Sequence, residues 1–219
     1  AGGGVYNHTA SATFANVTIA GNRTIRHGGG MYNYNGSNPT LTNVIISRND
    51  ACGGQGGGMY NTYSSSPILN GVVISGNTAY SGAGIRNTEY SSPTLTNVLI
   101  SGNTAAFQVS AGEVGGMYND KNSSPVLTNV TISGNSANWC GAMLNSQGSN
   151  PQIRNSIIWG NTTVTGPAMA NTGTSMPVIG YSLVEGGCSA ITGTVCGEGN
   201  IDVDPQFAEW YEPVPTMTE

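Results

Sequence analysis

The acidic residues that could carry acid–base chemistry are few and widely spaced over most of this chain. Before Glu185 they are Asp50, Glu89, Glu113 and Asp120. Enzymes that cleave glycosidic bonds need two facing carboxyl groups, or a carboxylate beside Lys, Arg or Ca²⁺. The spacing indicates no such cluster, and His8 and His27 have no acidic residue near them. We therefore predict no catalytic residues, with a polysaccharide lyase or glycoside hydrolase as the less favoured alternative.

The C-terminal segment contains a possible metal-binding pattern. Asn200, Asp202 and Asp204 alternate in the way that oxygen ligands do in calcium loops. The following Gly and the distal Glu of such loops are absent, and Pro205 comes directly afterwards. We favour a polar turn that closes the chain's repeats, and we predict no metal and no cofactor.

The composition restricts the possible partners. Charged residues make up 8% of the chain, about a third of the usual share, so the surface must be built from Asn, Ser, Thr and Gly. The six basic residues are scattered and form no stripe for phosphates, which argues against nucleic acid as a partner. No apolar run is long enough for a membrane span. This composition is common in secreted β-solenoids.

The four cysteines bear on the compartment. Cys188 and Cys196 lie close together in a Gly/Ser/Thr segment, and we predict a disulfide between them, which favours an oxidising environment. Cys52 and Cys140 fall three repeats apart. At ordinary strand spacing they would be about 14 Å apart, too far to bond within one chain.

Internal repetition dominates the sequence. A string of the type Gly-Met-Tyr-Asn ends at Asn7, Asn33, Asn61, Asn87, Asn119, Asn145 and Asn171. A second string, Ser-Pro-x-Leu-Thr-Asn-Val-x-Ile-Ser-Gly-Asn, follows each copy with variations. The unit is about 26 residues long, too short for a propeller blade and without a helical period.

Period-2 alternation within each unit predicts three short strands. We therefore predict an all-β fold, a right-handed parallel β-helix of about seven coils over residues 1–187. Residues 188–219 are expected to form a disulfide loop and a capping or linker tail. Three columns of asparagines mark the corners, where Asn tolerates left-handed backbone and its amide can hydrogen-bond from coil to coil. The same register predicts a surface ion pair between Glu89 and Lys121.

Two outward columns are candidates for contact with partners. The first contains Tyr6, Tyr32, Tyr60, Arg86 and Tyr118. Neighbours on a sheet face stabilise one another, which is the favoured interpretation, and an aromatic strip for sugar rings or a partner is the alternative. The second contains the apolar residues Ile45, Val73, Leu99, Ile157 and Leu183. Contiguous exposed apolar strips usually mark interfaces, so we expect this column to pack against another rod or another part of the chain.

The join between coils reads Ile-x-x-Asn-x-Ala and then Gly-x-Gly-Ile, as from Ile74 through Asn77 and Ala79 to Ile85. This pattern resembles the repeats of polymorphic outer-membrane proteins and of bacterial right-handed β-helix proteins. The segment Asp204-Pro205-Gln206-Phe207 is similar to the motif that closes such arrays. The resemblance covers most of residues 1–207 and implies an exported bacterial protein that acts in surface display or adhesion.

Together these features predict a non-enzymatic structural or adhesive protein, secreted or at the bacterial cell surface. We expect it to associate with itself, end to end or laterally, or to bind a cell-surface or glycan partner. A carbohydrate-binding or polysaccharide-degrading protein is the alternative. Ice binding is less favoured, because Ile68 interrupts the column of threonines that begins at Thr40. Residues 104–114, the longest insertion, are predicted to be a variable contact loop.

Overall fold

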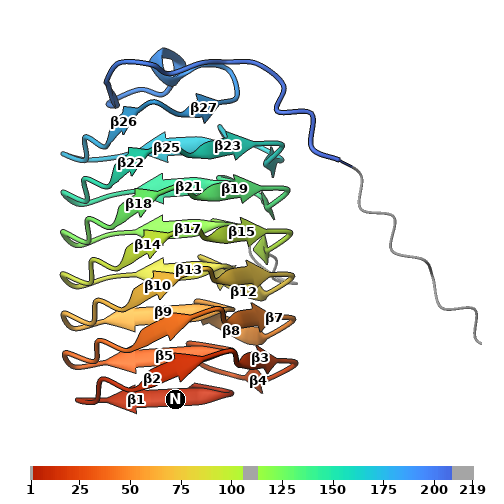
Figure 1. The fold of residues 1–219 in the computed structure, drawn as a ribbon, viewed down its shortest axis with the longest axis vertical. Coiled ribbons are helices and arrows are strands. Elements are labelled where there is room, and N and C mark those ends of the chain that lie inside the picture. The colour runs from red at the N-terminus through yellow and green to blue at the C-terminus, as the bar shows by residue number, and fades with distance from the viewer. Residues whose placement is uncertain (1, 106–112, 209–219) are drawn as a thin grey trace, which may run out of the picture.

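The chain winds into a parallel β-helix in which each coil stacks on the one before it (Figure 1). The computed structural model describes residues 2–105 and 113–208, so most of the 104–114 insertion lies outside the described residues. The solenoid and its number of coils, about seven, are as predicted. The prediction of three strands per coil is wrong, because the strands form four parallel sheets, which we call A to D.

Sheets A and B carry the two repeat strings. Sheet A consists of β1 (Val5–His8), β5 (Met31–Tyr34), β9 (Met59–Thr62), β13 (Ile85–Asn87), β17 (Met117–Asn119), β21 (Met143–Asn145) and β25 (Met169–Asn171). Sheet B consists of β2 (Thr13–Ala15), β6 (Thr40–Thr42), β10 (Ile68–Asn70), β14 (Thr94–Thr96), β18 (Val126–Thr128), β22 (Gln152–Arg154), β26 (Val178–Gly180) and β28 (Val195–Cys196).

Sheets C and D complete each coil. Sheet C consists of β3 (Thr18–Ala20), β7 (Ile45–Ser47), β11 (Val73–Ser75), β15 (Leu99–Ser101), β19 (Thr131–Ser133), β23 (Ile157–Trp159) and β27 (Leu183–Val184). Sheet D consists of β4 (Arg23–Thr24), β8 (Asp50–Gln55), β12 (Thr78–Ser81), β16 (Thr104–Ala105), β20 (Ser136–Ala137) and β24 (Thr162–Thr163). The strands of sheet D were missed because most are only two residues long and turn alanine, not a β-branched residue, inward.

Each repeat position pairs with the same position of the next coil, which stacks like on like in the core. Met31 lies opposite Met59, Leu41 opposite Leu69 and Ile46 opposite Ile74. All six of these side chains are fully buried in one continuous cluster. Alternate residues of these strands therefore form inward columns, as expected for strands, and the residues between them face outward.

The three asparagine columns have different structural roles. In the column Asn16, Asn43, Asn97, Asn129 and Asn155, between sheets B and C, φ lies between 50° and 56°, so this corner uses the left-handed tolerance of Asn. The asparagine column of sheet A, from Asn7 to Asn171, does not have positive φ. Its amides form a ladder in which each Nδ2 donates to the next Oδ1 at 2.7–2.9 Å.

The third asparagine column ties three coils together at once. The side chain of Asn77 donates through Nδ2 to Oδ1 of Asn103 in the next coil and to the carbonyl of Ile46 in the previous coil. A serine column forms a further ladder, in which the backbone N–H of Ser65 donates to Oγ of Ser91 at 3.1 Å. Buried polar groups are thereby satisfied along the stack.

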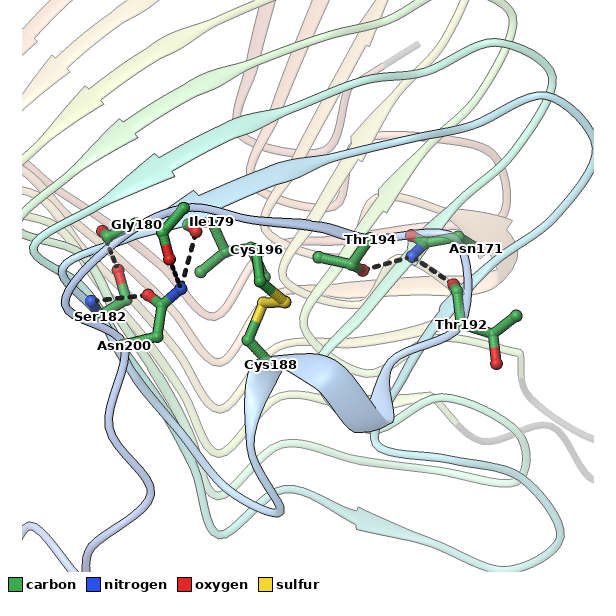
Figure 2. Close-up of a disulfide and its surroundings, with 10 residues drawn as sticks. Asn171, Ile179, Gly180, Ser182, Cys188, Thr192, Thr194, Cys196 and Asn200 are labelled. Atoms are coloured by element: carbon green, nitrogen blue, oxygen red, sulfur yellow. Dashed lines mark hydrogen bonds between the residues drawn. A yellow bond between two sulfur atoms is a disulfide. The ribbon is translucent and has the colours of Figure 1, made fainter.

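The last coil is covered at the C-terminal end (Figure 2). The 3₁₀ turn η1 (Cys188–Ala190) and strand β28 carry Cys188 and Cys196, whose sulfur atoms are bonded. Asn171, the last amide of the sheet A ladder, donates to the carbonyl of Thr192 and to Oγ1 of Thr194 in this covering segment. Residues 188–201 thus add a partial coil that covers the last full one.

We predict that Asn103→Ala lowers the free energy of unfolding by about 3 kcal/mol, because it removes four buried hydrogen bonds and leaves partners in adjacent coils unsatisfied. The matched control is Asn97→Gly in the left-handed column, which we expect to cost less than about 1 kcal/mol. Urea denaturation followed by circular dichroism measures both. Equal effects of the two variants would contradict the ladder's role.

Candidate functional site

Three tyrosines of the predicted outward column form the centre of the candidate site on sheet A. Tyr6, Tyr32 and Tyr60 are in register on β1, β5 and β9. Their ring centroids lie 5.4 Å and 5.1 Å apart between neighbouring coils. Tilted and edge-to-face contacts at this distance are favourable for aromatic rings. The sequence therefore predicted the position of these three side chains and their stacking on one another.

Four more rings extend this cluster, and the prediction missed them. Tyr34 contacts His8 and Tyr63, with ring centroids 5.2 Å and 5.0 Å apart. His27 stacks on Tyr60 at 4.7 Å. Tyr34 follows Tyr32 by two residues, so the period-2 rule could have placed it on the same face. We call the seven residues together the aromatic surface: Tyr6, His8, His27, Tyr32, Tyr34, Tyr60 and Tyr63.

Burial shifts the pKa of Tyr32, Tyr60 and His27 in the direction that favours the neutral form. Burial, followed by the neighbouring tyrosines, raises the pKa of Tyr32 to about 12. Burial lowers the pKa of His27, whose Nδ1 accepts a hydrogen bond from the backbone N–H of Gln55 at 3.1 Å. Around Tyr32 and His27 the aromatic surface therefore carries no charge at neutral pH.

The next residue of the column, Arg86, is not available for contact. Its side chain is 6% exposed, with Cζ 3.6 Å from the ring centroid of Tyr118 and Nη2 2.6 Å from Oδ2 of Asp120. The prediction of Arg86 as part of an exposed strip is thus wrong, and its guanidinium instead makes a cation–π contact with Tyr118. Nε and Nη1 of Arg86 and Oδ1 of Asp120 have no hydrogen-bond partner in the structure.

Farther along sheet A, large side chains from the preceding loops cover the outer face. Val114 and Cys140 are fully buried against Leu144, and Trp139 packs against the same cluster. In earlier coils glycines occupy these loops: a Cβ added to Gly56 would lie 2.7 Å from Cβ of Tyr60. The aromatic surface is therefore confined to the first three coils.

The four acidic residues of the coils each have a polar partner. Asp50 pairs with Arg23 at 3.2 Å, and Glu89 pairs with Lys121 at 3.0 Å, as its register predicted. The hydrogen bond from Lys121 to Glu89 raises the pKa of Lys121. Oε2 of Glu113 accepts from the hydroxyl of Ser81. Within the described residues, no three His, Cys, Asp or Glu side chains lie close enough to hold a metal ion.

The C-terminal acidic pattern bonds to backbone. Oδ1 of Asn200 accepts from the backbone N–H of Ser182, Oδ1 of Asp202 from that of Gly186, and Oδ1 of Asp204 from that of Gln206. The Asn200 contacts are drawn in Figure 2. Two of these bonds tie the segment to residues 182–186, and the third closes a local turn at Asp204.

The remaining cysteines are free and lie in different coils. Cys140 is buried, and burial raises the pKa of its thiol to about 12. Sγ of the half-buried Cys52 lies 3.4 Å from Nη2 of Arg23.

The apolar column on sheet C faces outward. Its members are in register from β7 to β27, with Thr131 between Leu99 and Ile157. Ile45 is 43% exposed, and the other members are half-buried. On sheet B, Ile68 stands between Thr40 and Thr94, so the threonine column that ice binding would require is interrupted. Among the described residues, η1 is the one helical segment, and it is far too short to cross a membrane.

A family model described as a right-handed β-helix region matches residues 2–196. No curated protein and no solved structure matches the chain. The family match covers all four sheets and ends within the covering segment. It agrees with the parallel pairing described above.

We predict that Arg86→Met destabilises the fold by about 3–5 kcal/mol, because it leaves the charge of Asp120 buried without a partner. The double variant Arg86→Met/Asp120→Leu should recover much of this loss. Lys121→Met, which breaks the exposed pair with Glu89, is the control and should cost less than about 1 kcal/mol. The urea midpoints of the three variants are compared. If the double variant recovers no stability, the unpaired charge of Asp120 is not the cause of the loss in Arg86→Met.

Proposed function

The chain belongs to the family of right-handed β-helix proteins, and we propose that within it this protein is non-enzymatic, extracellular and adhesive, and binds carbohydrate. The observation that carries the proposal is the aromatic surface: seven rings in mutual contact on one face of the first three coils. Aromatic rings offer flat apolar faces that match the C–H face of a pyranose ring. A ring-lined face without a carboxylate suits attachment to a glycan better than it suits catalysis.

The distribution of acids supports a non-catalytic role. Glycoside hydrolysis requires a general acid and a second carboxylate a few ångströms away. The aromatic surface contains no acidic residue. Near it, Asp120 is buried against Arg86, and Glu89 is held by Lys121 and by the hydroxyl of Thr62.

An extracellular location is part of the proposal. The bond between Cys188 and Cys196 suits an oxidising compartment. A surface rich in Asn, Ser and Thr and a charged share of 8% agree with secretion or display at a bacterial surface, as does the resemblance to polymorphic outer-membrane repeats.

Self-association is the second part of the proposal, and its support is the apolar column on sheet C. Lateral packing is favoured over stacking on the C-terminal end, because the covering segment already bonds to the last strands there. Two columns of half-exposed Ile, Val and Leu facing each other would remove apolar area from water.

We predict that Leu99→Lys abolishes concentration-dependent association, because a charge in the sheet C column opposes burial against a second rod. Ile68→Lys on the outer face of sheet B is the matched control and should associate like the unmodified protein. Sedimentation velocity over a concentration series distinguishes them. A protein that stays monomeric at every concentration would refute lateral association.

We predict that the protein co-sediments with at least one insoluble polysaccharide and releases no soluble sugar from it. Tyr34→Ala, which removes a ring in contact with His8 and Tyr63, should weaken retention about tenfold, the scale of one aromatic contact at an interface centre. Tyr181→Ala, between β26 and β27 in the last coil, should bind normally. Release of reducing sugar would show an enzyme, and no retention on any polysaccharide would refute the adhesive role.

A further inference from the structure

A groove lies at the edge of the aromatic surface, where the chain turns out of sheet A. Its volume is about 490 Å³, and it is lined by Asn35, Gly36, Tyr63, Ser64, Glu89 and Tyr90. These residues belong to the turns that follow β5, β9 and β13, three consecutive coils. The groove is continuous with the aromatic surface through the contact between Tyr63 and Tyr34.

The backbone in these turns is left-handed at residues that disfavour it. Tyr63, Ser64, Glu89 and Tyr90 have φ between 51° and 63°. In the preceding coil the same two turn positions hold Asn35 and Gly36, which adopt this conformation readily. The fold therefore does not require tyrosine at these positions, and two exposed rings kept on left-handed backbone beside a groove point to a function.

The side chains that this backbone presents are suited to a sugar. Tyr63 and Tyr90 are 52% and 65% exposed, so both rings are open to contact with a sugar. Between them Glu89 is held in place, with Oε1 3.0 Å from Nζ of Lys121 and Oε2 3.0 Å from Oγ1 of Thr62. A fixed carboxylate is a strong acceptor for sugar hydroxyls.

The charges in and around the groove favour a neutral glycan over an acidic one. The groove contains a carboxylate, its neighbouring cation Lys121 is already paired with that carboxylate, and the chain has a net charge of −5. An acidic polysaccharide would meet repulsion without a free cation to offset it. A neutral chain meets rings and hydrogen-bonding groups.

We propose that this groove is a binding subsite for a neutral glycan chain, with Tyr63 and Tyr90 as stacking platforms and Glu89 as the acceptor for hydroxyl groups. The proposal rests on the carbohydrate-binding function proposed above and assigns its specificity to the turns. Glycan lying in the groove would run across three coils and reach the rings of Tyr34 and Tyr63.

The test uses Tyr90→Asn and Tyr63→Asn, because asparagine removes the ring yet accepts the left-handed backbone, so folding is preserved. The matched control is Tyr181→Asn: Tyr181 is also exposed, at 53%, and also left-handed, at φ 51°, but lies elsewhere. Isothermal titration with neutral cello-, xylo- and manno-oligosaccharides measures affinity, beside acidic oligogalacturonides and a proline-rich peptide.

We expect a neutral oligosaccharide to bind, each groove variant to weaken it about tenfold or more, and the control to stay within about twofold. Unchanged affinity in both groove variants, with Tyr34→Ala still impaired on polysaccharide, would overturn the groove but leave the carbohydrate-binding function. Preference for oligogalacturonides or for the peptide would overturn the neutral-glycan assignment. Failure to bind any saccharide, soluble or insoluble, would overturn both proposals.

Discussion

The hydrogen bonds that asparagine side chains make between coils set the conditions for everything else in this molecule. The interior amides of the ladder that contains Asn77 each bond to the coil before and to the coil after. A donor and an acceptor must therefore recur at one spacing and in one register through the whole stack. Once that register is fixed, the inward columns must contain residues of similar size, because like stacks on like. Variation is left to the outward columns and the turns, and any function must lie there.

The extent to which the sequence predicted the structure follows from this constraint. The inward columns and the Glu89–Lys121 pair could be predicted, because both depend only on repeat position. Sheet D could not, since strands such as Thr104–Ala105 are too short to show alternation. The burial of Arg86 could not either, because it depends on how the inter-coil loops fold over sheet A and on the pairing with Asp120, which no repeat encodes. The groove was missed for a similar reason: Tyr63 and Tyr90 lie in turns, outside the period-2 pattern.

The loops before sheet A divide its outer face into two regions. In the early coils the loop residue that lies against sheet A is glycine, as at Gly28 and Gly56, because there is no room for a Cβ. No loop side chain therefore covers the tyrosine next to it. Where the loop carries Val114 or Trp139, the outer face becomes a small second core around Leu144. The same repeat therefore yields an accessible aromatic region in the early coils and a sealed region in the later ones. The buried Arg86–Asp120 pair lies at the boundary between them.

The turns after sheet A separate specificity from stability. The ladder asparagines lie within or at the end of the strands that precede these turns, so a turn residue can change without removing a ladder hydrogen bond. The cost of a non-glycine side chain in the left-handed conformation is local, of order 1–3 kcal/mol per residue, and a long stack with many buried ladders can tolerate several. Tyr63 and Tyr90 thus occupy turns whose left-handed backbone favours asparagine or glycine, the residues found at Asn35 and Gly36 in an earlier coil. Because these rings add nothing to the interior, contact with something outside the molecule is the effect that would justify that cost.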